Sequence, residues 1–337
     1  MRLLVSIFCV FATAGPLVPS VPLRAADPLE FRRIAIPTLG GKQFWADELF
    51  FHQWRIQRNV VDGHCRLLDA KNFRHASGTF EECRARLEQI RRQRNLPPMK
   101  GKAVIVLHGL FRTRSSMAEL CDYLQQQGGY TVFNVAYPST RRDVGGHARS
   151  LARIVENLEG IEEIDFVAHS MGNIVVRHYL ADQVRQRSPS EEAPTASARP
   201  VDPRIKRFVM LGPPNHGSLL ALTLAENSVL EAITGDTVRQ LGQDWTKLQA
   251  QLATPDCEFG IIAGGKGDGK GFNPLLPGDD DGTVTVASAR LAQAADFVLV
   301  PAFHSSIMDN QHVREYTLRF LQKGYFISPE KRQPIGN

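Results

Sequence analysis

The sequence has few of the cysteines that build metal clusters, and its positive and negative charges nearly balance. It has 5 cysteines in 337 residues, with no Cys-x-x-Cys pair and no His/Cys cluster at zinc spacing. The formal net charge is +5, and no run of Lys and Arg is long enough to indicate a nucleic-acid partner. These shortages argue against a zinc-stabilised fold and against binding to nucleic acid.

Long apolar runs are also missing after residue 26, where no segment approaches the roughly 20 apolar residues that a membrane-spanning helix needs. The first 26 residues differ, because a charged start precedes an apolar run from Leu3 to Val18, and small residues follow at Ala25 and Ala26. This order is typical of a secretory signal peptide. We therefore expect residues 1–26 to direct export to the periplasm or the extracellular space; the alternative is an uncleaved membrane anchor.

Four cysteines remain after the expected signal peptide: Cys65, Cys83, Cys121 and Cys257. An even number in an exported chain permits disulfides. Cys65 and Cys83 are close in sequence and form the first pair to consider. The alternative is four buried thiols, and the sequence leaves both open.

Residues 27–101 precede the pattern that dominates the rest of the chain. They are rich in aromatic residues that must be buried, and residues 77–92 have the apolar spacing of a helix. We interpret this segment as an N-terminal extension packed on the core, with no function that the residues reveal.

From residue 102 onward, apolar runs of strand length alternate with helical patterns. The predicted strands are residues 103–107, 130–136, 164–168, 205–211, 259–263 and 297–300. Helices are predicted between them, and a last one over residues 313–322. This alternation predicts an α/β fold with a mostly parallel central sheet and helices on both faces, in one domain over residues 102–325.

Two further segments have a distinct composition. Residues 186–203 are rich in Ser, Pro, Ala and Glu without periodicity, which predicts a flexible loop. Residues 326–337 are interpreted as a C-terminal tail.

The stretch around Ser170 has the features of a nucleophile elbow. An apolar strand leads into Ala168-His169-Ser170-Met171-Gly172, and a helix pattern follows. Small residues flank the serine because so tight a turn has no room for larger ones, and the helix N-terminus places free N–H groups beneath it. We predict that Ser170 is a nucleophile; the alternative is a structural serine at a helix start.

A serine nucleophile requires a base and a carboxylate, which in an open parallel sheet come from loops that follow strands. Asp281 follows the strand at 259–263 through a Gly/Asp-rich loop, and His304 comes directly after the last strand. We predict Asp281 as the orienting carboxylate and His304 as the base. The rival base, His312, falls at the start of the last predicted helix.

The loop around Asp281 has two further interpretations. Its three consecutive aspartates are compatible with a solvated acidic loop, or with a calcium loop in which Asp279 and Asp280 hold the ion.

Two backbone N–H groups are expected to form an oxyanion hole. One belongs to Met171, directly after the nucleophile, and the other to Leu110, in the loop after the first core strand. Gly109 lets that loop turn so that the N–H of Leu110 faces the site. The alternative is a strand that simply ends in a glycine turn.

With these motifs in place, the chain resembles the α/β-hydrolase superfamily, and within it the bacterial lipase-like serine esterases. The resemblance covers roughly residues 102–320. It rests on residues 106–110, on the elbow, on Asp281-Gly282-Thr283-Val284, on His304 and on the Gly-Pro-Pro-Asn-His-Gly-Ser turn at 212–218. The chain departs from the family pattern in Ala168, where a glycine is usual, and in the long N-terminal extension.

The resemblance implies an acyl-enzyme mechanism on a carboxylic ester or lipid, with a Ser-His-Asp triad and no cofactor. It also implies that residues 218–254 stand where relatives often carry a lid or cap, which would open at a lipid surface in a transient contact. Ordinary helices packed on the core are the alternative for these residues. The same triad would also serve an amidase, a thioesterase or an acyltransferase, and the same fold would also serve a non-catalytic binding module.

Overall fold

The computed structural model describes residues 36–37, 42–187, 202–218 and 237–336. The expected signal peptide, most of the expected flexible loop and residues 219–236 of the expected lid lie outside these ranges. Within the described ranges, no helix has the length and apolar character needed to cross a membrane.

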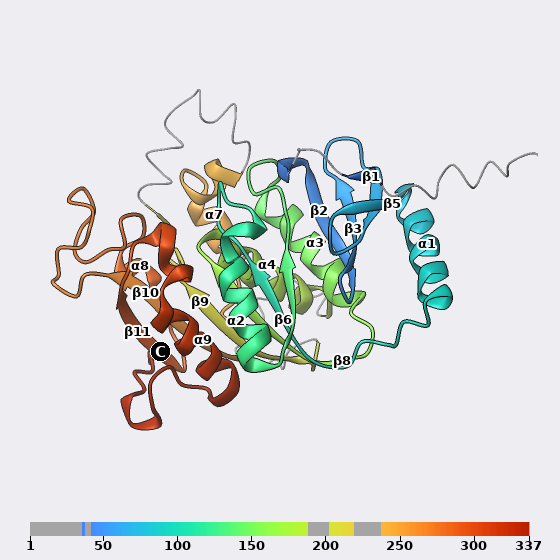
Figure 1. Cartoon of the computed structure of the whole chain (residues 1–337). Coiled ribbons are helices and arrows are strands. Elements are labelled where there is room, and N and C mark those ends of the chain that lie inside the picture. Colours follow the sequence, from blue (N-terminus) through green and yellow to red (C-terminus); the bar gives the residue numbers. More distant parts are fainter. Residues whose placement is uncertain (1–35, 38–41, 188–201, 219–236, 337) are drawn as a thin grey trace, which may run out of the picture. The chain divides into compact units, whose positions relative to one another are not determined.

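A six-stranded, entirely parallel sheet forms the centre of the described chain, in the order β11-β10-β9-β8-β6-β7 (Figure 1). Its strands are β6 (Gly101–Leu107), β7 (Thr131–Val135), β8 (Ile161–His169), β9 (Ile205–Leu211), β10 (Glu258–Gly265) and β11 (Asp296–Pro301). All six predicted strands are present, with bounds shifted by a few residues at most. The predicted α/β architecture, with a mostly parallel central sheet and helices on both faces, is confirmed.

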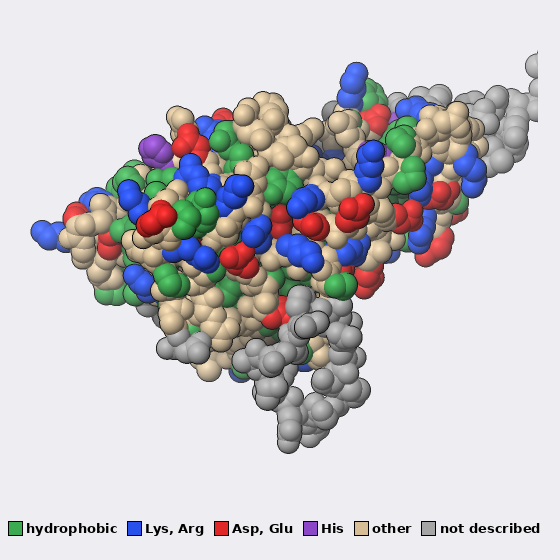
Figure 2. Space-filling model, turned by 90° about the horizontal axis from the view of Figure 1, so that it is seen from below, with side chains coloured by type: hydrophobic (Ala, Val, Ile, Leu, Met, Phe, Trp, Pro, Cys, Tyr) green, Lys and Arg blue, Asp and Glu red, His purple; other side chains and the backbone are tan. Residues whose placement is uncertain are grey.

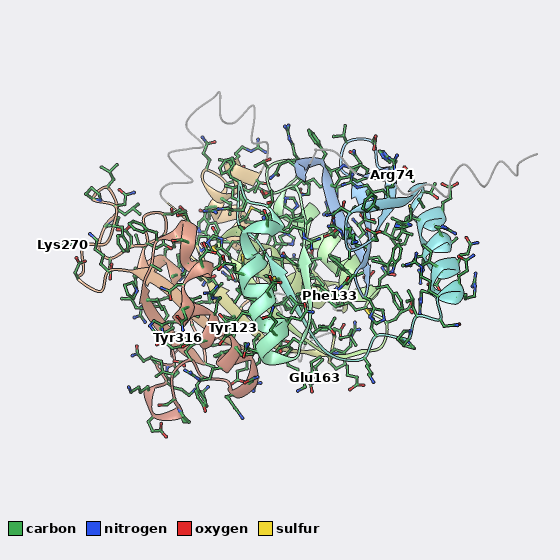
Figure 3. All side chains as sticks on the ribbon, in the orientation of Figure 1. Arg74, Tyr123, Phe133, Glu163, Lys270 and Tyr316 are labelled. Atoms are coloured by element: carbon green, nitrogen blue, oxygen red, sulfur yellow. The ribbon has the colours of Figure 1, made fainter. Side chains whose placement is uncertain are left out.

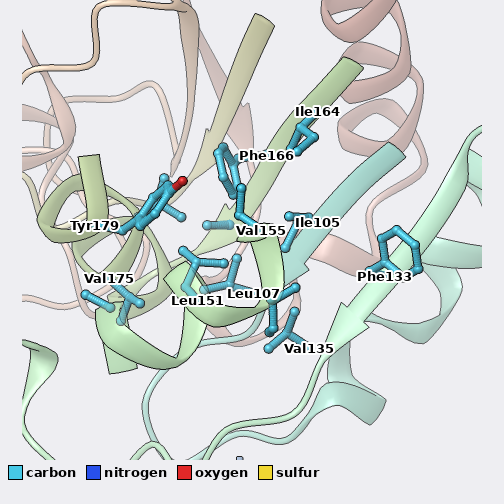
Figure 4. Packing of buried hydrophobic residues seen from close by; sticks show 14 of the residues in the cluster. Ile105, Leu107, Phe133, Val135, Leu151, Val155, Ile164, Phe166, Val175 and Tyr179 are labelled. Atoms are coloured by element: carbon cyan, nitrogen blue, oxygen red, sulfur yellow. The ribbon is translucent and has the colours of Figure 1, made fainter. Parts of the chain in front are cut away.

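Helices cover both faces of this sheet, because alternate residues of each strand point to opposite sides. On one face, strand residues such as Ile105 and Phe166 pack with α3 (Val144–Glu156) and α4 (Met171–Arg187); Figure 4 shows this packing. On the other face, strand residues such as Val106 pack with α2 (Ala118–Gly128) and α9 (Gln311–Lys323).

The predicted N-terminal extension folds largely into a second sheet, of five antiparallel strands in the order β1-β5-β4-β3-β2. These are β1 (Ile36–Pro37), β2 (Trp45–Phe51), β3 (Trp54–Asn59), β4 (Cys65–Leu68) and β5 (Phe73–Gly78), and α1 (Phe80–Gln93) follows them. The helix lies close to its predicted range, whereas the sequence pattern did not reveal the strands.

The second sheet is joined to the parallel sheet by backbone bonds and by aromatic packing. The N–H of Asp47 donates to the carbonyl of Ala136 at 2.8 Å, and the N–H of Ala136 donates to the Asp47 carboxylate at 2.6 Å. Phe133 of β7 packs on Phe50 of β2 with ring centroids 5.2 Å apart; Figure 3 labels Phe133. The two sheets therefore share one hydrophobic cluster.

The four cysteines of the described chain are all free and buried, so the Cys65–Cys83 pairing considered from the sequence is wrong for this structure. Burial raises the pKa of the Cys65 thiol to about 11 and that of Cys83 to about 12. Both thiols are thus protonated at neutral pH, which makes them poor nucleophiles.

Part of the expected lid region is described. Residues 237–241 are helical, α7 (Trp245–Gln249) follows, and Val238, Leu241 and Leu248 are buried. These described residues pack as ordinary core helices do.

Candidate active site

The three predicted triad residues lie together at the carboxyl ends of the parallel strands. His304 Nε2 is 2.8 Å from Ser170 Oγ, and His304 Nδ1 is 2.7 Å from Asp281 Oδ2. Ser170 follows β8, Asp281 follows β10 and His304 follows β11. Both Asp281 and His304 are buried, which keeps water away from the bond between them.

The turn at Ser170 has the strained backbone of an elbow. Ser170 has a φ of 54°, in the left-handed region that few side chains adopt, and its N–H donates to the carbonyl of Leu211 at 2.9 Å. A Cβ on Gly172 would lie 2.9 Å from the carbonyl oxygen of His108. Glycine is therefore required at this position, as the motif predicted.

Asp281 is held so that one carboxylate oxygen remains for the imidazole. Oδ1 accepts the N–H groups of Thr283 and Val284, at 3.0 Å and 2.7 Å, while Oδ2 faces His304. The N–H of His304 also donates to the carbonyl of Asp281 at 2.7 Å. The two residues are thus coupled through both backbone and side chain.

His169 holds the backbone of His304, a contact that the sequence did not reveal. Its Nε2 lies 2.9 Å from the carbonyl oxygen of His304, which requires the tautomer with the proton on Nε2. Burial and the neighbouring His304 lower the pKa of His169 well below its usual range, so the ring is neutral.

The loop predicted to supply an oxyanion donor passes close over the serine. A Cβ on Gly109 would lie 2.9 Å from Cβ of Ser170, so only glycine fits. The loop is held from behind, because the Tyr137 hydroxyl donates to the carbonyl of His108 and the His108 ring stacks on Tyr137. Of the predicted oxyanion residues, Leu110 follows Gly109 in this loop, and Met171, the first residue of α4, directly follows Ser170.

The glycine turn after β9 lies against the same group of residues. Gly212 has a φ of 49°, and a Cβ there would lie 3.1 Å from Asp281 Oδ2 and 3.2 Å from His304 Nδ1. The far end of the turn, residues 216–218, lines an open cavity of about 400 Å³. Its apolar lining includes Leu241, Trp245 and Leu276, and Thr283 and Ser288 add hydroxyl groups.

Several exposed apolar side chains flank the residues of the site in sequence. Phe111 follows the oxyanion loop and is 49 % exposed, and Phe303 precedes His304 and is 54 % exposed. Leu275, in the loop that leads to Asp281, is 88 % exposed. The guanidinium of Arg112 donates to the carbonyl of Ser305 at 2.8 Å and so ties the first two of these loops together.

The remaining candidates lie outside the site or have other partners. His312 is on α9, where its side chain is 68 % exposed. Asp279 accepts the N–H groups of Lys266 and Gly267, and Asp280 accepts those of two other loop residues. The carboxylates that a calcium loop would need thus organise their own turn, and no group of three or more metal-binding side chains occurs in the described ranges.

Solved structures that are similar to this fold include several lipases, all at low sequence identity. No family model and no curated protein sequence matches the chain. A solved lipase from Bacillus licheniformis, BlEst2 in its mature form, is 21% identical with a TM-score of 0.48, over 67% of this chain and 94% of that one. The phospholipase PlaB of Legionella pneumophila in complex with thio-NAD is 18% identical with a TM-score of 0.46, over 66% of this chain and 58% of that one. A lipase from Staphylococcus hyicus is 11% identical with a TM-score of 0.44, over 63% of this chain and 90% of that one.

Proposed function

We propose that this protein is a serine hydrolase that cleaves carboxylic esters. The observation that carries the proposal is the hydrogen-bonded chain from Ser170 Oγ through His304 to Asp281, with distances of 2.8 Å and 2.7 Å. A hydroxyl, an imidazole and a buried carboxylate in this order can activate a nucleophile at neutral pH.

In the proposed reaction, Ser170 Oγ attacks the ester carbonyl while His304 Nε2 takes its proton. Asp281 keeps the imidazole oriented and stabilises the imidazolium. The N–H groups of Leu110 and Met171 bind the oxyanion, and His304 then protonates the leaving alcohol. Water, activated by the same histidine, cleaves the acyl-enzyme and restores the serine. The residues of the chain suffice for every step.

For the substrate we propose an acyl ester or a lipid. The cavity lined by residues 216–218 of the glycine turn includes apolar side chains, as an acyl chain requires. Phe111, Phe303 and Leu275 expose apolar surface beside the catalytic loops. Such side chains can enter a lipid surface transiently, which would bring the ester to Ser170.

For the location we propose export through the signal peptide at residues 1–26, on the sequence pattern alone. N-terminal sequencing of protein recovered from the periplasm or the medium tests this. A start near residue 26 or 27 is expected, and an intact first residue in the membrane fraction would contradict it.

Labelling with a fluorophosphonate probe tests the activated serine. Label is expected on the unaltered chain and absent from Ser170→Ala, with Ser116→Ala as the matched control because Ser116 lies outside the site. An unlabelled chain that is folded would overturn the proposal and favour a binding module.

The bond specificity is tested with p-nitrophenyl esters of increasing acyl length, with and without a detergent interface. We expect ester cleavage that increases with chain length and at the interface. Preference for matched thioesters or amides would instead assign a thioesterase or an amidase to the same triad.

A further inference from the structure

Five arginines line one open hollow of about 580 Å³. Arg58 comes from β3, Arg141 and Arg142 from the loop between β7 and α3, and Arg149 and Arg153 from α3. Asp143 and Gly146 complete the lining. The second sheet and the parallel domain thus both contribute to the hollow, and none of its residues takes part in the proposed ester chemistry.

A buried carboxylate fixes two of these arginines in place. Glu48 of β2 is fully buried, and both of its oxygens lie 2.9 Å from Nε of Arg58. The same carboxylate accepts a hydrogen bond from Arg153. Both guanidinium groups are therefore held by charge-assisted hydrogen bonds in the lining of the hollow, while parts of each remain exposed.

The remaining arginines leave the hollow with an excess of positive charge. Arg141 and Arg142 have no carboxylate partner among the described residues, and Arg149 reaches Asp143 only at 3.8 Å. Asp143 is further engaged as the N-cap of α3, where it accepts the N–H of Gly146 at 2.6 Å. Five guanidinium groups thus face two carboxylates that already have partners.

The electrostatic consequence is visible at Arg142. Burial and the positive charge of Arg153 lower its pKa from the usual value, and the nearby Glu48 offsets only part of this shift. A positive charge in such a place gains stability from any anion that enters. On the face that Figure 2 shows, Lys and Arg side chains lie interspersed with Asp and Glu.

We infer that this hollow binds a phosphate-bearing anion, either as a free ion or as the headgroup of a lipid. Guanidinium groups recognise phosphate oxygens with paired N–H donors, and the N-terminus of the 13-residue helix α3 adds its own favourable field. The volume is sufficient for a phosphodiester headgroup as well as for a single phosphate.

The position of the hollow links it to the site. The loop that carries Arg141 and Arg142 follows the carboxyl end of β7, the same edge of the sheet at which Ser170 lies. It is also tied to the chain after residue 236, because the Thr237 hydroxyl donates to the carbonyl of Arg142 and the N–H of Val144 donates to Gln240. An anionic headgroup held here would hold the enzyme with this edge toward the lipid.

The test measures binding without turnover, in the full chain carrying Ser170→Ala, so that it does not depend on ester hydrolysis. Inorganic phosphate is titrated by calorimetry at constant ionic strength, and vesicles of phosphatidylglycerol in phosphatidylcholine are titrated by sedimentation. The variant is Arg141→Gln with Arg142→Gln. The matched control is Arg92→Gln with Lys323→Gln, which removes the same charge from exposed positions on α1 and α9.

We expect saturable phosphate binding that weakens at least tenfold in the variant and less than twofold in the control. A parallel tenfold loss on the vesicles would assign the site to a lipid headgroup, and unchanged vesicle binding would assign it to a free phosphate. If the variant does not fold, Arg149→Gln replaces it, since that side chain is 65% exposed. The inference is overturned if neither probe binds saturably, or if the control loses as much as the variant.

Discussion

The two sheets bury charge in different places. In the parallel sheet, Asp281 and His304 are buried beyond the carboxyl ends of β10 and β11, and Asp165 is buried at the middle of β8. In the antiparallel sheet all seven residues of β2 are buried, and Asp47 and Glu48 lie in the middle of them.

The partners of these groups explain the difference. The carboxylates of Asp47 and Glu48 accept hydrogen bonds from donors of their own sheet and of neighbouring elements. Their charge therefore stabilises the fold and does not face a reacting group. His304 is bonded on one side to Asp281 and on the other to a hydroxyl that is partly exposed. A buried ionisable group that faces an accessible nucleophile can take part in a reaction, whereas one bonded only to structural donors cannot. Replacing single aspartates by asparagine tests this comparison.

The largest effect is expected for Asp281→Asn. The Asn oxygen can still accept the N–H groups of Thr283 and Val284, but its NH₂ group would face Nδ1 of His304 and favour the wrong imidazole tautomer. We expect kcat for p-nitrophenyl ester hydrolysis to fall about 10⁴-fold with little loss of stability. A fall below tenfold, with the fold intact by circular dichroism, would show that Asp281 does not orient the base.

Asp47→Asn should have the reverse effect. Its carboxylate accepts hydrogen bonds from the Gln57 amide at 2.7 Å and from the N–H of Ala136 at 2.6 Å. The NH₂ group of an asparagine would face one of these two donors and leave it without an acceptor. We expect the free energy of unfolding to fall by about 3 kcal/mol, with kcat per folded molecule nearly unchanged. Urea denaturation and active-site titration measure the two quantities. Loss of kcat without loss of stability would contradict the assignment of a purely structural role to Asp47.

The sequence revealed the site better than the second sheet, for a physical reason. A nucleophile elbow needs small residues beside the serine, and strand ends of a parallel sheet meet at one edge, so Ser170, Asp281 and His304 could be placed from local patterns. In β2, by contrast, charged residues interrupt the apolar run, and β5 is largely half-buried, so neither strand shows alternation.

The supports of the site could not be predicted because they depend on contacts that are distant in sequence. His169 and His304 are 135 residues apart, and nothing near His169 indicates that its ring meets that carbonyl. Tyr137 likewise supports the oxyanion loop from 29 residues away. The one sequence feature that pointed to such supporting contacts was the occurrence of two histidines, His108 and His169, at the ends of otherwise apolar strand segments.

Asp165→Asn is expected to stabilise the protein above neutral pH. Burial raises the pKa of Asp165 to about 7, so the folded state holds a proton that the unfolded state loses near pH 4. The stability that this carboxyl contributes is present below pH 4 and is lost as the pH rises to about 7. Above that pH we expect Asp165→Asn to be more stable by about 2–4 kcal/mol, since the Asn oxygen can still accept the N–H of Arg207.

Urea denaturation of both chains at pH 4 and at pH 8 measures this effect. The difference should be small at pH 4, where the aspartate is neutral in the folded state and about half protonated in the unfolded state. A variant that is less stable at pH 8 would mean that the ionised carboxylate is favoured in the fold, and would group Asp165 with Asp47.

The smallest expected effect compares two helix caps, one on each sheet. Thr79 caps α1 in a capping box with Glu82, and Asn310 caps α9 by accepting the N–H groups of His312 and Val313. We expect Thr79→Ala and Asn310→Ala each to lower the free energy of unfolding by about 1 kcal/mol, because a cap satisfies local N–H groups whichever sheet the helix covers. Thermal denaturation measures both. If Thr79→Ala had no effect while Asn310→Ala cost the expected amount, α1 would unfold separately from the parallel sheet, and the shared hydrophobic cluster would not couple the two.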